Sequence, residues 1–545
     1  MTQASFIKDS DMDKCKSKLI VGGELLRPHV PQTGPNFVDT SEGDITPECV
    51  HDGKIGFAKG EKIIGSYVAL DTSDGTIVPE TVIKNEVGYS NGERIVGSYE
   101  PLDTSDGTIT PETVLDGEIG YSHGERIVGA VPKPQQPGQL SVRFISPVPD
   151  KHGNVVIKEV FVNRGGSVAL PPVPNPDSAY LIPDGWTHDA SDLSNIQYDM
   201  DVGALYRTVD GKTYFWGETT AGSGYILPFR FSMQSGTGVF RIEWGDGTTQ
   251  DIGTGSGSLS FDKNFVGKYS ASIQRLSGDG VLGLGANSSN NFIHGNNPAE
   301  TLKRLYIGDS VIFGANGFVN GNGVDTFVFQ RGFDGFGTGG SMSEMKNLKS
   351  LVIPPGTTAL NGNNFQRAFP LEAVVLSHGI KTLETNVLSD TFSLSRAVIP
   401  DSVEVIGNSV LSNAYSMTSF VLKGDNLTSI GTYVGNSSRS LRTLILTGIA
   451  NIPSDCFRYM TALQSLTLDD KIEQAGSNAL SIDKTCRVVE CHAVIPPSIP
   501  SSMLGGLLST AKIYVPDASI EAYKQATNWL TRANQILPMS SKPTG

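Results

Sequence analysis

Three groups of residues in the sequence have types and spacings that could carry chemistry. Cys486, Cys491 and His492 lie close together, and thiolate and imidazole groups are both zinc ligands. A structural zinc site needs further ligands, however, and the eight histidines of the chain are dispersed without ligand spacing. We therefore expect buried or free thiols. A bond between the two cysteines stays open, because it depends on whether the loop brings them together.

The other two groups are a glycine-rich run and a single aspartate. Residues 335–340 read Gly-Phe-Gly-Thr-Gly-Gly and match Gly-x-Gly-x-x-Gly, but they stand among short repeats, which favours an insertion loop over a dinucleotide site. Asp246 lies in a Gly-Asp-Gly turn and lacks the alternating acidic residues of a calcium loop, so it predicts turn chemistry.

Motifs of the common catalytic sites are missing from the sequence. It has no Gly-x-Ser-x-Gly, no His-Glu-x-x-His and no Gly-x-x-x-x-Gly-Lys-Ser/Thr. We therefore predict no catalytic, cofactor-binding or metal-binding residues and expect the chain not to be an enzyme. Paired carboxylates that meet only in space, as in glycoside hydrolysis, remain an open alternative.

Composition narrows the class of protein further. The chain has 545 residues, and 42 Lys+Arg against 56 Asp+Glu give a net charge of −14, which argues against nucleic acid as a partner. No apolar run reaches the ~18 residues of a membrane span, so no membrane insertion is expected. Charged residues make up 18% while Gly is 62 and Pro is 30, a profile typical of short strands joined by turns. A mainly β, multidomain chain is predicted.

An internal repeat fills residues 39–131. Its three copies begin at Asp39, Asp71 and Asp103, 32 residues apart. In each copy two β-prone runs flank an x-Gly pair, which predicts a hairpin because the turn needs positive φ. Such a unit cannot bury a core alone and must stack on neighbours or other chains. We therefore expect a homo-oligomer, a trimer first and a dimer second.

The sequence pattern of these copies resembles the short hairpin repeats of bacteriophage tail and fibre proteins. It reads D-T-S-x-G-x-I-x-P-E-x-V and then G-Y-S-x-G-E-R-I-V-G. The resemblance implies an elongated stalk, with residues 1–38 as a virion-attachment segment. Prolines in residues 132–139 then predict a stiff linker.

Two β modules are expected next. Residues 140–216 carry V-x-x-G-x-x-V-x-x-P-x-x-P, then G-W and A-x-Y, an order that resembles the small β-grasp-like repeats of bacterial surface proteins, with a longer loop between Trp186 and Ala204. Residues 217–285 carry W-G-D-G-T and later G-x-Y-x-x-x-I, which resembles a PKD-like β-sandwich.

A second repeat follows in residues 286–511. Six-residue segments such as LKSLVI at 348 and LEAVVL at 371, which we call strand lines, recur every 22 to 24 residues. Their positions 1, 4 and 6 are apolar, which is the pattern of a leucine-rich-repeat solenoid. Between the lines we expect a second short strand, a turn and a short helical stretch. The sequence I-P-D-S-V-E-V-I-G-N-S-V-L resembles the BspA-like leucine-rich repeats of bacterial surface adhesins.

Residues 512–545 are expected to cap the solenoid. A strand leads through Pro516 to a helix in which Ile520, Tyr523 and Trp529 cover the last repeat. The helix should begin with Asp517 or Ser519 as its N-cap.

The solenoid is also where binding is expected. Residues between the inward positions of the strand lines, and aromatic residues in the connections, are the candidate contacts, and the loop from Gly332 to Gly340 is the best single candidate for an adaptable one. The candidate ligand-contact residues are Phe333, Phe336, Arg396, Tyr415, Tyr433, Arg442 and Tyr459.

Together these resemblances predict a structural fibre of a tailed bacteriophage, on the head or the tail. Its N-terminal part would bind other virion proteins (portal, tail or capsid), and its repeats would bind a host surface glycan or protein. The start of the sequence has no apolar signal segment, which fits assembly into virions in the host cytoplasm. The alternatives are a bacterial cell-surface adhesin with BspA-like repeats and a virion-borne polysaccharide-degrading enzyme.

Overall fold

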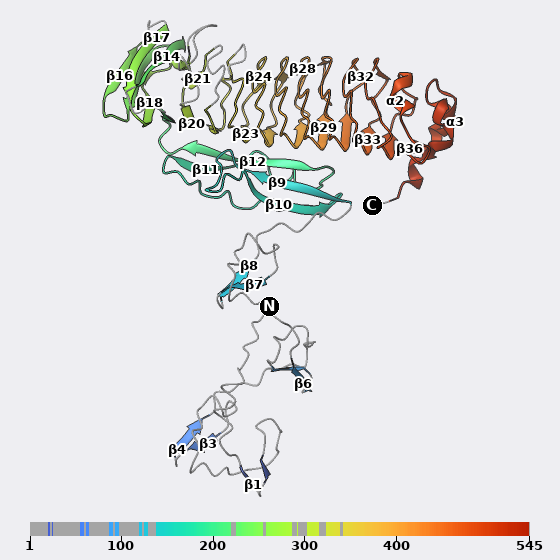
Figure 1. The fold of residues 1–545 in the computed structure, drawn as a ribbon, viewed down its shortest axis with the longest axis horizontal. Coiled ribbons are helices and arrows are strands. Elements are labelled where there is room, and N and C mark those ends of the chain that lie inside the picture. Colours follow the sequence, from blue (N-terminus) through green and yellow to red (C-terminus); the bar gives the residue numbers. More distant parts are fainter. Residues whose placement is uncertain are drawn as a thin grey trace. The chain divides into compact units, whose positions relative to one another are not determined.

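A computed structural model describes residues 138–219, 225–253, 258–285, 292, 302–314, 323–337 and 342–543, together with paired strands before residue 138 (Figure 1). The chain divides into two compact units, Met1–Lys133 and Pro134–Gly545.

The N-terminal unit contains the hairpins that the repeat predicts. In all three copies one strand lies on each side of the x-Gly position, and the two strands pair antiparallel with each other. The pairs are β3 (Ile55–Ala58) with β4 (Glu61–Ile64), β5 (Val87–Ser90) with β6 (Glu93–Val96), and β7 (Ile119–Ser122) with β8 (Glu125–Val128). A further short pair joins β1 (Ile20–Val21) to β2 (Glu24–Leu25). The predicted attachment segment and linker otherwise lie outside the described residues.

A small β domain opens the second unit. Its sheet has the order β10-β9-β12-β11, in which the central pair β9 and β12 is parallel and both outer pairs are antiparallel. Trp186 anchors this sheet: its ring packs edge-on against Phe144 at 5.1 Å and its Nε1 donates to the Pro171 carbonyl. The strands are β9 (Gln139–Ile145), β10 (Val156–Asn163), β11 (Leu181–Trp186) and β12 (Met200–Thr208).

Two packed sheets follow, and they extend beyond the predicted sandwich of residues 217–285 at both ends. One sheet has the order β16-β15-β18-β13-β20-β22 and the other β17-β14-β19-β21. Alternating residues of β15 point inward, and Phe240, Ile242 and Trp244 are buried. The strands are β13 (Thr213–Glu218), β14 (Tyr225–Ser235), β15 (Gly238–Trp244), β16 (Thr249–Gly253), β17 (Ser258–Phe265), β18 (Lys268–Gly278), β19 (Val281–Leu284), β20 (Leu302–Ile307), β21 (Val311–Phe313) and β22 (Thr326–Phe329).

The sandwich and the solenoid share their sheets. Strand β20 pairs antiparallel with β13 of the sandwich and parallel with β22 of the first coils, and β19 pairs parallel with β21. One hydrophobic core therefore runs from Phe215 to Ile536. The sandwich closes the N-terminal end of the solenoid, which a stack of repeats needs because each repeat is covered only by its neighbours.

The main strands of the solenoid form two parallel sheets, of two and seven strands, which we together call the long sheet. The strands up to Leu468 form at the predicted lines. In the first line, Leu348, Leu351 and Ile353 are fully buried, so positions 1, 4 and 6 point inward as expected. The coil at β22 was not predicted, because the inserted glycine-rich segment interrupts the spacing. The strands are β23 (Ser350–Ile353), β25 (Ala373–Leu376), β27 (Arg396–Ile399), β29 (Ser419–Lys423), β31 (Thr443–Thr447), β33 (Ser465–Leu468), β35 (Val488–Cys491), β36 (Lys512–Val515) and β37 (Ile536–Pro538).

Short second strands also form between the lines, as predicted. They pair in parallel, one coil with the next. They are β24 (Ala359–Leu360), β26 (Thr382–Leu383), β28 (Val405–Ile406), β30 (Ser429–Ile430), β32 (Asn451–Ile452) and β34 (Gln474–Ala475).

The short helical stretch expected after these strands is wrong. Its place is taken by turns in which every second residue is left-handed, as at Asn386 (φ 62°), Leu388 (φ 58°) and Asp390 (φ 58°). This conformation turns the backbone N–H groups toward the next coils: the Asn386 amide donates to the Asn408 carbonyl and the Leu388 amide to the Asn364 carbonyl. The left-handed residues therefore bond to the neighbouring coils, while the alternating amides of Val387 and Ser389 bond within the turn.

The C-terminal segment covers the last coils. Its helices are α2 (Ser501–Gly505) and α3 (Ile520–Gln525), and β36 and β37 extend the long sheet. Tyr523 and Trp529 are fully buried, which confirms their covering role, and the Trp529 Nε1 donates to the Pro497 carbonyl at 2.9 Å. Ser519 is the N-cap residue of α3, as predicted, but its side chain makes no cap bond, because its hydroxyl donates to the Val494 carbonyl at 2.7 Å.

Candidate functional site

The small β domain packs on the long sheet of the solenoid, where ligand contacts were expected. Figure 1 shows β9–β12 lying along the strand face of β23 to β29. The contact has an apolar centre of Ile145 and Leu205 from the domain against Val352, Ala373 and Val375 from the solenoid. These residues lie in strands that alternate inward and outward side chains, so the outward side chains of β23 and β25 are covered by the chain itself.

Polar contacts extend this interface in both directions. The Ser350 hydroxyl donates to the Ser146 carbonyl at 2.7 Å, and the Arg331 guanidinium donates to the Asp184 carbonyl at 3.2 Å. Farther along the solenoid, the Lys423 ammonium lies 5.1 Å from the centre of the Tyr198 ring. The docked stretch therefore runs from the end of β22 to β29.

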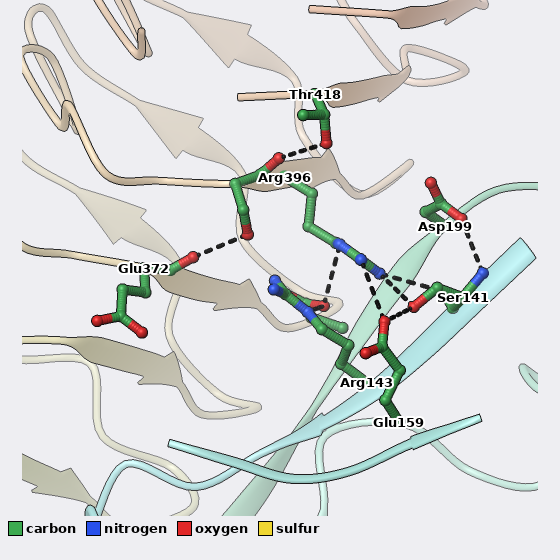
Figure 2. Close-up of polar contacts among 9 residues, drawn as sticks. Ser141, Arg143, Glu159, Asp199, Glu372, Arg396 and Thr418 are labelled. Atoms are coloured by element: carbon green, nitrogen blue, oxygen red, sulfur yellow. Dashed lines mark hydrogen bonds and ion pairs between the residues drawn. The ribbon is translucent and has the colours of Figure 1, made fainter. Parts of the chain in front are cut away.

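A buried ionic cluster lies in the middle of the interface (Figure 2). Arg143 of the small domain holds the Asp201 carboxylate through Nε at 2.8 Å and Nη2 at 2.6 Å. From the solenoid, Nη1 of Arg396 donates to the carbonyl and hydroxyl oxygens of Ser141, both at 3.1 Å, and Nη2 lies 3.7 Å from Glu159. The Arg396 Nε is 3.6 Å from Asp201 and makes no hydrogen bond with any described residue.

The two guanidinium groups differ in how well their charge is compensated. Burial pulls the pKa of Arg143 down, but the adjacent Asp201 more than offsets this, so the pKa is raised. At Arg396 burial dominates and lowers the pKa, although Asp201 opposes the shift. The acidic neighbours therefore compensate the buried charge of Arg143 more fully than that of Arg396.

Three of the candidate contact residues are not at the surface. Arg396 is buried in the ionic cluster, with a side chain only 12% exposed. Phe333 and Phe336 are 7% and 4% exposed and lie in the core, each ring 5.0 Å from that of Phe329. The expectation that these three residues are exposed is wrong. The small β domain, distant in sequence, covers Arg396, and packing between coils buries Phe333 and Phe336. Residues 338–341 of the glycine-rich loop lie outside the described residues.

The other candidates are exposed. Tyr415, Tyr433 and Tyr459 are 39%, 44% and 48% exposed, and Arg442 is also exposed. The Arg458 guanidinium lies 4.4 Å from the centre of the Tyr459 ring. Their exposure leaves their role as ligand contacts a prediction.

Tyr415 belongs to a stacked row that the sequence reasoning missed. Phe369 stacks on Phe392 at 4.9 Å, Phe392 stacks on Tyr415 at 4.9 Å, and the Arg439 guanidinium lies 5.5 Å from the Tyr415 ring. We call these four residues the aromatic ridge. Each of the three rings stands two residues before the first apolar residue of a strand line, and this periodic position could have revealed the row.

The cysteines and Asp246, two of the three groups that could have carried chemistry, make contacts within the protein. Cys456, Cys486 and Cys491 are buried and unpaired, and burial raises the pKa of Cys456 and Cys486 to about 11, so their thiols stay neutral and weakly reactive. Asp246 accepts bonds from the Thr248 hydroxyl and amide and pairs with Lys263, and these bonds lower its pKa to about 2. Within the described ranges, no three His, Cys, Asp or Glu residues gather as metal ligands.

Coils of parallel short strands around one apolar core define the C-terminal part as a leucine-rich-repeat solenoid. Six copies of the BspA type Leucine rich repeat region match residues 339–464 and 428–493. The chain therefore carries BspA-type repeats there, while the resemblances seen in residues 39–131 and 217–285 lie outside these matches.

Other comparisons add little. A crystal structure of a leucine rich cell surface protein from Faecalibacterium prausnitzii A2-165 is similar at 14% identity, covering 44% of this chain and 80% of that one, with a TM-score of 0.18. No curated protein matched the chain. Among the described residues, no helix has the length and apolar character needed to span a membrane.

Proposed function

We propose that this protein is a non-enzymatic adhesin-type binding protein of a cell surface, which contacts a partner protein through the aromatic ridge. The observation that carries the proposal is the ridge itself: Phe392 and Tyr415 are 37% and 39% exposed although their rings are large and apolar. The BspA-type repeats of the same coils support the surface assignment, because such repeats resemble those of bacterial adhesins.

The ridge suits a protein partner. Tyr and Arg are enriched in the residues that dominate binding energy, and stacked rings are held rigid before binding, which lowers the entropy cost of association. The docked small domain supports the ridge as the contact surface, because it excludes the strand face of the same coils from binding. It covers the outward side chains of β23 and β25, so the turns preceding the strands are the exposed route to the same coils.

The test is binding of the full chain to intact bacterial and epithelial cells, measured by flow cytometry. A Phe392→Ser/Tyr415→Ser double variant should bind at least about tenfold more weakly, because two central rings of the contact are lost. Leu508→Ser/Leu530→Ser is the matched control, since both side chains are apolar and 52% exposed but lie outside the ridge and outside the candidate contacts. Unchanged binding by the double variant, or an equal loss in the control, would overturn the proposal.

A phage fibre is the second candidate, favoured by the N-terminal hairpins. Strands β3, β5 and β7 begin at Ile55, Val87 and Ile119 and repeat with the sequence period, as a stalk of stacked hairpins requires. On this proposal the chain assembles as a trimer, or otherwise a dimer, and binds portal, tail or capsid proteins through its N-terminal part. Mass spectrometry of purified virions from the source strain would detect the chain, and its absence there would exclude the fibre.

A further inference from the structure

An open hollow of about 680 Å³ lies between the small β domain and the sandwich, away from the ionic cluster. Its walls come from three places: the segment before β11 supplies Tyr180, strand β13 supplies Trp216 and Glu218, and strands β18 and β20 supply Lys268 and Lys303. The volume is within the ~300–1,000 Å³ range of sites that bind small molecules.

Aromatic rings form one wall of the hollow. Tyr180 packs on Tyr214 at 4.6 Å and on Trp216 at 5.2 Å, yet remains 42% exposed. Trp216 is in turn fixed edge-on by the buried ring of Tyr306 at 4.8 Å. A half-exposed aromatic surface is thus held in place before any ligand arrives, which lowers the cost of binding.

Charged side chains of both signs complete the hollow. The lining contains three basic and three acidic residues and so carries no net charge: Lys268, Lys303 and Arg304, and Asp177, Glu218 and Asp325. A strongly anionic or cationic ligand would meet as many like charges as opposite ones. A neutral ligand with many hydroxyl groups meets no such penalty, because a hydroxyl both donates to carboxylates and accepts from ammonium groups.

We propose that this hollow binds a neutral oligosaccharide, with an apolar sugar face on Tyr180 and Trp216 and the hydroxyl groups on the charged rim. Aromatic surface beside a few polar side chains is the usual make-up of a specific small-ligand site. The proposal concerns a site separate from the aromatic ridge and stands independently of the proposed protein partner.

Tryptophan fluorescence tests the site directly in the full chain. Of the four tryptophans, Trp186, Trp244 and Trp529 are 8%, 4% and 0% exposed, whereas Trp216 is half-buried and lines the hollow. We would titrate the protein with trimers of β-1,4-linked glucose, α-1,4-linked glucose, β-1,4-linked galactose and β-1,4-linked N-acetylglucosamine. A saturable change in emission is expected with at least one of them, and Trp216→Phe should abolish it.

The variant Tyr180→Ala should weaken the binding about tenfold, because it removes the exposed ring while leaving the buried floor intact. Tyr433→Ala is the control, and an unchanged thermal midpoint verifies folding of both variants. No saturable change for any trimer up to about 10 mM, where even a weak site would show, would overturn the proposal. Equal affinity of Tyr180→Ala and the unsubstituted protein would overturn it too. So would a response to a peptide library alone, which would assign the hollow to a protein.

Discussion

The ionic cluster between the small domain and the solenoid allows a sharp comparison of two similar substitutions. Arg143→Met and Arg396→Met each remove one guanidinium group from the same interface and keep a long apolar side chain. The two arginines have equally buried side chains, both 12% exposed. Differences in cost must therefore arise from how well the partners of each group compensate its buried charge.

Arg143→Met should be the more damaging change. It removes both close bonds to Asp201, whose side chain is only 4% exposed, and leaves that carboxylate with Arg396 at 3.6 Å. Removing one partner of a buried pair costs about 3–5 kcal/mol. Arg396→Met loses two bonds to Ser141 but also removes a charge that burial disfavours, so we expect a cost of about 1 kcal/mol.

Hydrogen exchange in the full chain measures both costs as opening of the interface. Amide protection in β12 should fall more than about 100-fold in Arg143→Met and only about fivefold in Arg396→Met. The exchange of β36, which lies outside the docked stretch, serves as the internal control. Equal losses of protection in the two variants, or a larger loss in Arg396→Met, would refute the claim that Arg143 is the main partner that neutralises Asp201.

Two further predictions concern the interface and the turns. His188 of the small domain lies at the docked interface, where it lines a cavity together with Lys423 of the solenoid. Burial lowers the pKa of His188 below its ordinary 6.5, although Asp192 opposes the shift, so the docked state binds fewer protons than the open one. Docking should be strongest above pH 6.5 and weaken as the pH falls through the lowered pKa, a trend seen as growing protease sensitivity that His188→Gln flattens. Asn386 is left-handed (φ 62°), and its side chain donates to Asn363 at 2.9 Å. In urea unfolding, Asn386→Ala should lower the free energy of unfolding by about 2 kcal/mol, because it loses the bond and strains the backbone. Asn386→Gly should lower it by only about 1 kcal/mol, since Gly adopts the left-handed backbone easily.

Repeats and periodic patterns made the fold largely predictable. The x-Gly pairs located the hairpins, and the apolar positions of each line located β23 to β33 to within a residue or two. The left-handed turns were not predictable, because residues such as Leu388 adopt φ 58° against their own preference. There, bonds between coils and burial in the core outweigh the local conformational cost.

The surface was harder to predict than the core. Arg396 stands at an outward position of its strand, and nothing near it in sequence tells that Ser141, some 255 residues earlier, lies against it. Phe333 and Phe336 stand in a glycine-rich run that resembles an exposed loop. By contrast, the regular spacing of Phe369, Phe392 and Tyr415 is visible in the sequence.

The docked small domain has a consequence for how this protein can change in length during evolution. Neighbouring strands of a sheet are about 4.8 Å apart, so inserting a coil between β22 and β29 would shift later contacts by that distance. Arg396 would then miss Ser141, or Lys423 would miss Tyr198. Coils added after Lys423 disturb neither contact. Related chains should therefore differ in coil number between β31 and β35 and keep it constant before them.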